Sequence, residues 1–128
     1  MKVSKFGGTS LADAAQIQKV CDIIAADPER RLVVVSAPGK RHKDDIKVTD
    51  MMIACAQKLL STGTAQAELD AVIDRYADIQ TSLELPGSII EHIKMDLISR
   101  LSMKPDHPAH EARFIDLLKA AGEDNCAR

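Results

Sequence analysis

Apolar positions divide the chain into a short αβ segment and a long helical segment. Residues 2–6 and 32–36 read as strands, and the second contains Leu32-Val33-Val34-Val35, the continuous run typical of a strand covered on both faces. Between them, apolar positions recur with helical spacing up to Asp27-Pro28, where a helix should end. They are Leu11, Ala14, Ile17, Val20, Cys21 and Ile24. This order predicts a right-handed, parallel βαβ unit.

Capping residues and turns indicate where the helices begin. Thr9 or Ser10 would cap the first helix, because a hydroxyl there can accept a hydrogen bond from a free backbone N–H. After the second strand, a turn at 36–40 opens a charged loop at 41–45, expected to be a mobile loop or lid, and Thr49 would cap the next helix. Four apolar stripes with helical spacing follow: Met52, Ile53, Ala56, Leu59 and Leu60; Leu69, Val72, Ile73, Tyr76, Ile79 and Leu83; Ile89, Ile90, Ile93, Leu97 and Leu101; Phe114, Leu117 and Leu118.

The predicted sheet is small for a parallel one. Parallel sheets are normally larger and buried on both faces, so two strands beside five helices should leave apolar edges uncovered. Residues 122–128 read as a polar turn after the last helix, with no terminal element behind it. We therefore expect the chain to be one piece of a longer protein.

Composition and charge exclude several classes of function. The chain has 128 residues with 45% hydrophobic content, which suits one domain that buries roughly two-thirds of its unfolded surface. A net charge of −2, no long basic run and only three aromatic residues argue against nucleic-acid and membrane partners. Cys21, Cys55 and Cys126 are widely spaced, without a CxxC pair or a signal peptide, so cytoplasmic, reduced thiols are expected.

The most informative local motif is Lys5 followed by Gly7 and Gly8, between the first strand and the first helix. Glycines let backbone N–H groups approach an anion, a helix N-terminus adds partial positive charge, and Lys5 can supply a full charge. The motif predicts a phosphate site. The plainer alternative is an ordinary turn with Lys5 as a solvated strand end. The sequence matches neither a Walker A loop nor a GxGxxG dinucleotide fingerprint.

Other candidate residues have plainer interpretations from spacing alone. Ser36 could satisfy a backbone group at a strand end, and Thr49 could be only a helix cap. His107 and His110 lie three residues apart and could share a helix face as metal ligands, but the prolines beside them favour an exposed loop. We assign no metal to them.

Several motifs in the same order resemble the N-terminal part of the aspartokinases, members of the amino acid kinase family. They are Lys5-Phe6-Gly7-Gly8-Thr9-Ser10, Leu32-Val33-Val34-Val35-Ser36-Ala37, Val48-Thr49-Asp50 and Gly122-Glu123. The similarity runs over essentially the whole chain. The first string looks particular to aspartokinases, whereas acetylglutamate, carbamate and uridylate kinases share only an early Lys and a Gly-Gly.

The resemblance implies an incomplete αβα sandwich of the carbamate kinase-like type, helix-rich after the first βαβ unit. The nucleotide-binding half and the ACT regulatory domains of the family have no counterpart in residues 1–128. The implied activity is phosphorylation of the L-aspartate side chain by ATP and Mg²⁺, which gives 4-phospho-L-aspartate for lysine, threonine and methionine synthesis. The full-length enzyme would be a cytoplasmic homo-oligomer, and residues 1–128 alone should be inactive.

Motif matching also implies the role of the glycine turn. Lys5 would be the catalytic residue and, together with Gly7 and Gly8, would bind the nucleotide phosphates. An aspartate side chain has a pKa of about 3.9, so it is already an anionic nucleophile at neutral pH and needs no general base. Catalysis would then depend on position and on stabilising charge at the phosphoryl oxygens.

The remaining matched positions would bind the substrate. Thr9, Ser36 and Thr49 would contact its carboxylates or phosphate, and Glu123 would pair with the aspartate ammonium. Many relatives continue the Gly-Glu pair with Arg-Leu-Ser, whereas this chain has Asp124-Asn125-Cys126, which leaves the local backbone open.

Two other functions stay open at this point. One is a different amino acid kinase, acting on glutamate or on a nucleotide monophosphate. The other is a non-enzymatic helical interaction module that reuses the phosphate turn.

Overall fold

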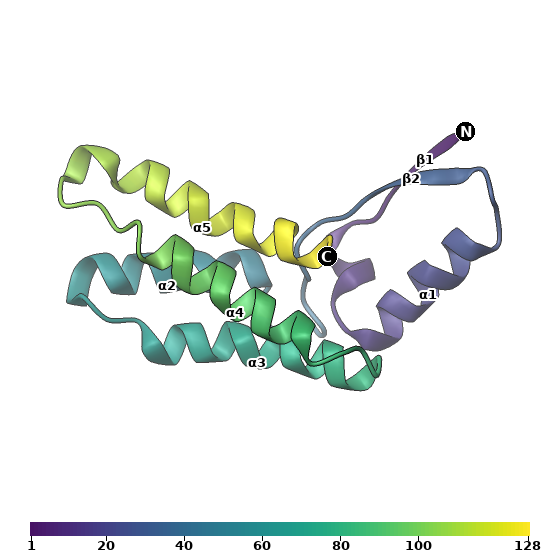
Figure 1. The fold of residues 1–128 in the computed structure, drawn as a ribbon, viewed down its shortest axis with the longest axis horizontal. Coiled ribbons are helices and arrows are strands. Elements are labelled where there is room, and N and C mark those ends of the chain that lie inside the picture. Colours follow the sequence, from purple (N-terminus) through teal and green to yellow (C-terminus); the bar gives the residue numbers. More distant parts are fainter.

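The computed structural model describes residues 1–128 as an elongated molecule with a small αβ part at one end and four long helices at the other (Figure 1). The αβ part contains β1 (Lys2–Lys5), the 3₁₀ turn η1 (Gly8–Leu11), α1 (Ala14–Ala25) and β2 (Arg30–Val34). The helical part contains α2 (Val48–Thr62), α3 (Gln66–Ser82), α4 (Ser88–Leu101), the 3₁₀ turn η2 (Pro108–His110) and α5 (Glu111–Cys126). The expected order of two strands and five helices is confirmed.

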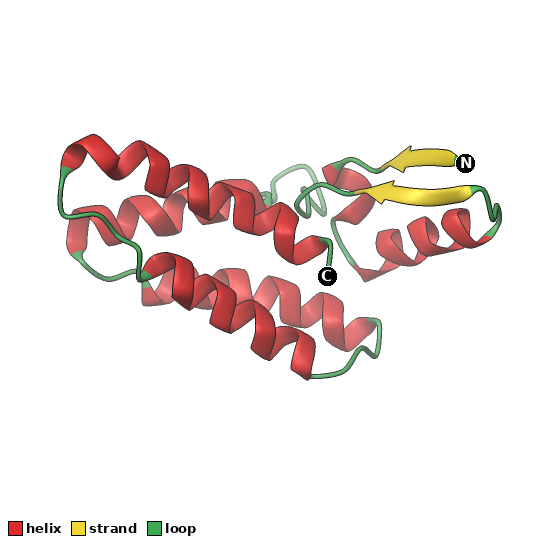
Figure 2. Cartoon of the chain, turned by 45° about the horizontal axis from the view of Figure 1, so that its top comes forward, coloured by secondary structure: helices red, strands yellow, loops and turns green.

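The two strands form a parallel pair, as predicted, with Lys5 opposite Val34. β2 begins and ends two residues before the predicted range of 32–36, so Ser36 lies beyond the strand. The prediction that both faces of β2 are covered is wrong, because α1 lies on one side of the strands and nothing covers the other (Figure 2). Leu32 is 50% exposed and Val33 41% exposed, and these neighbours point to opposite faces of the strand. The two-stranded sheet therefore leaves apolar side chains uncovered on both faces.

The first helix starts later than predicted. Thr9 and Ser10 lie inside the 3₁₀ turn η1 and do not cap α1. Asp13 is the cap, because its carboxylate accepts a hydrogen bond from the backbone N–H of Gln16 at 2.9 Å. Leu11, at the end of η1, is buried.

The core lies in the helical part and confirms the predicted apolar stripes. α2 packs along α5, while α3 packs against α2 and α4. Gly63 ends α2 in the left-handed conformation, at φ 80°, which a glycine adopts without strain. The buried cluster contains Val48, Met52, Cys55, Ala56, Ala65, Leu69, Val72, Tyr76, Ile93, Leu97, Phe114, Leu118 and Ala121, together with Ala37 from the loop after β2.

Two helix ends differ from the prediction. Thr49 does not cap α2, since the helix begins at Val48, whose N–H donates to Pro38 O at 2.9 Å. The predicted polar turn at 122–128 is wrong, because α5 continues to Cys126. It continues because both Gly122 and Asn125 are buried against neighbouring segments, so their side of the helix belongs to the core.

The three cysteines are free, with Cys55 buried, Cys126 half-buried and Cys21 exposed. Burial raises the pKa of the Cys55 and Cys126 thiols to about 11, so both are protonated at neutral pH. None of the helices combines the length and apolar character that crossing a membrane requires.

We expect replacement of Gly122 by alanine to lower the free energy of unfolding by about 1–2 kcal/mol. An added Cβ would lie 2.8 Å from the Ala37 side chain, and such overpacking costs more than the gain of about 1 kcal/mol from helix propensity. The control is Gly87→Ala, where an added Cβ meets nothing within 4 Å. Urea unfolding measures both, and equal stability of the two variants would contradict the tight packing at Gly122.

Candidate active site

The segments that carry the predicted site residues meet where both strands end. Parallel strands place their carboxyl ends at the same edge, and Phe6 N–H donates to Val34 O at 2.9 Å as the strands finish. The glycine turn follows β1 and the loop 36–40 follows β2. Gly39 N–H then donates to Gly8 O at 2.8 Å, which joins these two loops.

The glycine turn presents free hydrogen-bond donors. The N–H groups of Gly7, Gly8 and Thr9 donate to no backbone carbonyl of the chain, and Gly7 is extended at φ −80° and ψ 172°. Lys5 is exposed at the end of β1, just before these donors. Consecutive free N–H groups beside an ammonium group form an arrangement suited to bind an anion.

The contact between the two loops requires glycine at position 39 and leaves little room for a side chain at position 8. A Cβ on Gly39 would lie 2.5 Å from the carbonyl carbon of Gly8 and 2.8 Å from the backbone nitrogen of Thr9. A Cβ on Gly8 would lie 3.2 Å from Ala37 O. Gly39 is a structural determinant of the site that motif matching missed, because the sequence identifies its segment only as a turn.

Arg75 of α3 is the second residue that motif matching missed. Its side chain is only 3% exposed, and its guanidinium donates to Ala12 O at 3.0 Å, to Ile46 O at 2.9 Å and to Gly39 O. These carbonyls belong to the end of the glycine turn, the approach to α2 and the loop after Ser36. Burial lowers the pKa of Arg75, and the nearby Arg41 adds to this, but an arginine with such partners stays charged at neutral pH.

Hydrogen bonds join the two ends of the charged loop 41–45, which the sequence predicts as a mobile loop or lid. The Asp45 carboxylate accepts hydrogen bonds from Arg41 at its backbone N–H, Nε and Nη2, at 2.9, 2.7 and 2.9 Å. It also lies 3.8 Å from Nη1 of Arg75. The hydrogen bonds from Arg41 hold the pKa of Asp45 well below its usual range. His42 and Lys43 stay exposed at the tip of the loop.

The end of α5 joins the same edge through Gly122. The buried hydroxyl of Tyr76 donates to Gly122 O at 2.8 Å, and the backbone of Gly122 lies against Ala37. Burial raises the pKa of Tyr76, so the hydroxyl is a neutral donor over the physiological range. Glu123 follows directly, exposed in the last turn of α5, close to the segment that contains Ser36.

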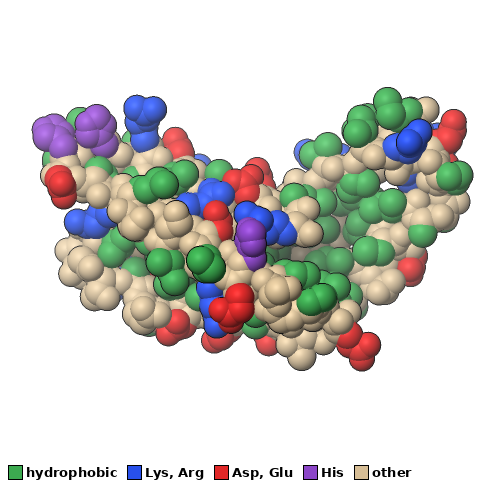
Figure 3. Space-filling model, viewed as in Figure 1, with side chains coloured by type: hydrophobic (Ala, Val, Ile, Leu, Met, Phe, Trp, Pro, Cys, Tyr) green, Lys and Arg blue, Asp and Glu red, His purple; other side chains and the backbone are tan.

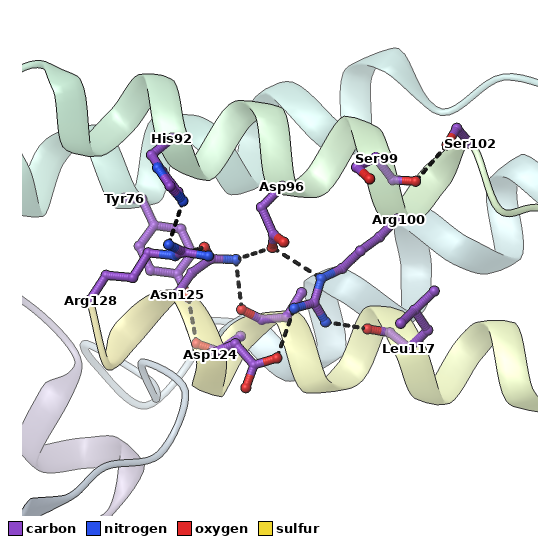
Figure 4. Close-up of polar contacts among 12 residues, drawn as sticks. Tyr76, His92, Asp96, Ser99, Arg100, Ser102, Leu117, Asp124, Asn125 and Arg128 are labelled. Atoms are coloured by element: carbon purple, nitrogen blue, oxygen red, sulfur yellow. Dashed lines mark hydrogen bonds and ion pairs between the residues drawn. The ribbon is translucent and has the colours of Figure 1, made fainter.

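The residues that depart from the family pattern after Glu123 bind α5 to α4 (Figure 4). Asp124 accepts from Arg100 Nη2 at 2.7 Å, and Arg100 Nε donates to Asp96 at 3.0 Å. Asn125 Nδ2 donates to the same Asp96 carboxylate at 2.8 Å. Asp124 and Asn125 therefore differ from the family pattern but keep the end of α5, which carries Glu123, a regular helix.

The remaining predicted residues lie on the converging segments without touching one another. Thr9 is exposed in η1, Ser36 is half-buried after β2, and Thr49 is half-buried in the first turn of α2. No side-chain hydrogen bond connects them to Lys5 or Glu123. The segments are brought together by backbone contacts and by the side chains of Arg75 and Tyr76.

No group of three or more His, Cys, Asp or Glu side chains is arranged to hold a metal ion. Among the histidines, His107 Nδ1 accepts from Ala109 N–H at 3.1 Å and caps the short turn η2. His110 lies beside it, with 6.0 Å between the ring centroids.

The amino acid kinase family model matches residues 1–127. The chain belongs to this family. It is 50% identical over all 128 residues to aspartokinase 3 of Bacillus subtilis, of which it covers 28%. It is also 36% identical over 92 residues to the lysine-sensitive aspartokinase 3 of Escherichia coli, a match that covers 72% of this chain and 19% of the relative.

Solved structures agree with the sequence relatives. The aspartate kinase of Clostridium acetobutylicum matches with a TM-score of 0.74 and 29% identity, over 96% of this chain and 26% of that one. Escherichia coli aspartokinase III, solved in complex with aspartate and ADP, matches with a TM-score of 0.66 and 29% identity, over 97% and 26%. The predicted fold and the resemblance to aspartokinases are confirmed. The chain spans less than a third of the length of each of these relatives.

We expect Asp45→Asn to lower the free energy of unfolding at pH 7 by about 1.5 kcal/mol, the scale of a hydrogen bond to a charged group. Asp45 has a depressed pKa in the folded state, so its contribution is present above the unfolded pKa of about 3.9 and declines as the pH falls below that value. The wild-type and variant stabilities should therefore stay apart down to about pH 4 and converge as the pH falls from about 4 toward about 2. Urea unfolding across this range, with the exposed neighbour Asp44→Asn as control, measures the effect. A loss that does not change with pH would contradict this role.

Proposed function

We propose that residues 1–128 form the N-terminal part of an amino acid kinase catalytic domain that phosphorylates the side-chain carboxylate of L-aspartate. The product would be 4-phospho-L-aspartate, for lysine, threonine and methionine synthesis. One observation carries the proposal: the glycine turn, the loop with Ser36, the first turn of α2 and the end of α5 converge at one edge. The aspartokinase that is 50% identical over the whole chain, and the one solved with aspartate and ADP, support it.

The phosphate end of the site lies at the glycine turn. Free N–H groups at Gly7, Gly8 and Thr9, together with the Lys5 ammonium, are donors that would face the transferring phosphoryl oxygens. Such fixed donors act most strongly where negative charge develops in the transition state. The acceptor carboxylate is already ionised at neutral pH, so this chain needs to position two anions rather than remove a proton.

The aspartate end lies between α2 and α5. Thr49 is in the first turn of α2, where a hydroxyl and the helix N-terminus favour a carboxylate. Ser36 offers a second hydroxyl from the loop after β2. Glu123 is exposed and has no ion pair within the chain, so its carboxylate is available to the substrate ammonium.

Residues 1–128 can meet part of what binding ATP and Mg²⁺ requires. ATP would supply the transferred phosphoryl group, and Mg²⁺ bound with nucleotide phosphates usually needs only one or two protein carboxylates. Three free N–H groups and a lysine suit the phosphates. We assign the adenosine end to the part of the family's catalytic domain that lies outside residues 1–128. The free thiols fit a cytoplasmic location, and the exposed strands fit further association in a homo-oligomer.

The full-length gene product should phosphorylate L-aspartate in the presence of ATP and Mg²⁺. The assay measures ADP formation with aspartate, glutamate, acetylglutamate, carbamate and uridine monophosphate as acceptors, and identifies the acyl phosphate formed from aspartate as its hydroxamate. Residues 1–128 alone should show no turnover and little ATP affinity, because the adenosine end is missing. Preference for another acceptor would replace aspartate as the assigned substrate. Turnover by the 128-residue chain alone would refute the assignment of the adenosine end to a region outside residues 1–128.

We expect Lys5→Met in the full-length gene product to reduce kcat by a factor on the order of 10², because a charged donor aimed at developing charge acts mainly in the transition state. The KM for aspartate should change much less. Lys2→Met is the matched control at the other end of β1, where Lys2 pairs with Asp27 at 2.6 Å. Near-normal kcat in the Lys5 variant would remove the catalytic role from this residue.

A further inference from the structure

Two adjacent residues of α3 hold the two ends of the candidate site. Arg75 and Tyr76 are 3% and 5% exposed, and both direct their polar atoms at backbone carbonyls of the converging segments. We propose that Arg75 positions the phosphate end and Tyr76 positions the aspartate end. This inference rests on the proposed function for its kinetic consequences, but it stands on contacts that no motif match includes.

The contacts of Arg75 all fall on segments that carry the phosphate end and the start of α2. Ala12 O closes the glycine turn, Gly39 O lies in the loop that crosses Gly8, and Ile46 O precedes Val48 by two residues. A planar guanidinium can reach three carbonyls in fixed directions, whereas an ammonium group cannot reproduce this fork. Arg75 therefore sets the relative placement of three loops at once.

The cost of burying Arg75 favours a positioning role over a stabilising one. Its Nε atom is buried without a hydrogen-bond partner, and its nearest carboxylate, on Asp45, is 3.8 Å away. Buried charges with incomplete partners add little stability compared with an apolar side chain of similar size. What the guanidinium provides instead is one defined arrangement of the loops around it.

Tyr76 acts on the other end of the site through a single hydrogen bond. Its hydroxyl donates to Gly122 O at 2.8 Å, one residue before Glu123. On its other side, Tyr76 lines a cavity of about 270 Å³ between α1, α3, α4 and the end of α5, which Asn125 and Cys126 also line. Figure 3 shows the surface hollowed between the helical part and α1. Because side chains do not fill this space, the hydroxyl is a main restraint on the last turn of α5 from this direction.

Substitutions of Tyr76 and Arg75 should change different kinetic constants of the full-length gene product. Tyr76→Phe keeps the ring and removes the hydroxyl, so we expect the KM for aspartate to rise about fivefold, with the KM for ATP unchanged. Glu123→Gln should raise the same constant. Arg75→Lys keeps the charge and loses the fork, so kcat should fall about tenfold or more through misplaced donors. Arg113→Lys, on the exposed side of α5, is the control and should change neither constant.

Amide hydrogen exchange on the same proteins gives a readout that does not depend on turnover. Tyr76→Phe should speed exchange in the last turn of α5 and not in residues 39–48, and Arg75→Lys should do the reverse. Uniformly faster exchange in both variants, or an unchanged aspartate KM in an active Tyr76→Phe enzyme, would overturn the inference. If the wild-type protein phosphorylates no aspartate, the proposed function fails, while the exchange pattern still decides whether the two residues position separate segments.

Discussion

The buried guanidinium of Arg75 is the interaction on which the arrangement of the site depends. The strands pair only with each other, and α1 contacts the helices mainly through α3, so the loop after β2 makes most of the other contacts with the helical part. Arg75 reaches across this boundary to the carbonyls of Ala12, Gly39 and Ile46. A charge in that place must be satisfied by hydrogen bonds. The loops therefore settle around the guanidinium in the one arrangement that supplies their carbonyls to it.

Close backbone approach is the second constraint, and it explains why the site is built from glycines. Gly39 and Gly8 touch through their main chains, whereas the backbone of Gly122 packs against the Ala37 methyl group. Each contact brings an element end within reach of the next with at most a methyl group between them. Free N–H groups and short polar side chains can then share one small region, which a small anionic substrate requires.

The sequence was sufficient to predict the parallel βαβ unit, the four long helices and the glycine turn, because each has a local signal in spacing or composition. It misplaced the first helix start, because Asp13 is a better-placed cap than Thr9 or Ser10. It also missed Arg75, although this residue lies three positions after buried Val72 and therefore on the apolar face of α3. Charge alone suggests a surface residue, and only the tertiary structure supplies the three carbonyls that make burial possible.

The end of α5 shows how a departure from a family pattern can keep the feature that matters. Asp124 and Asn125 replace the residues that many relatives carry, and no local rule relates them to Asp96 and Arg100 on α4. In the structure those four side chains form one network, and the helix stays regular through Glu123. The exposed carboxylate is thus held by two independent restraints, the network on one side and the Tyr76 hydroxyl on the other. A substrate-binding side chain can tolerate changed neighbours when its backbone is fixed from two directions, since neither restraint alone determines its place.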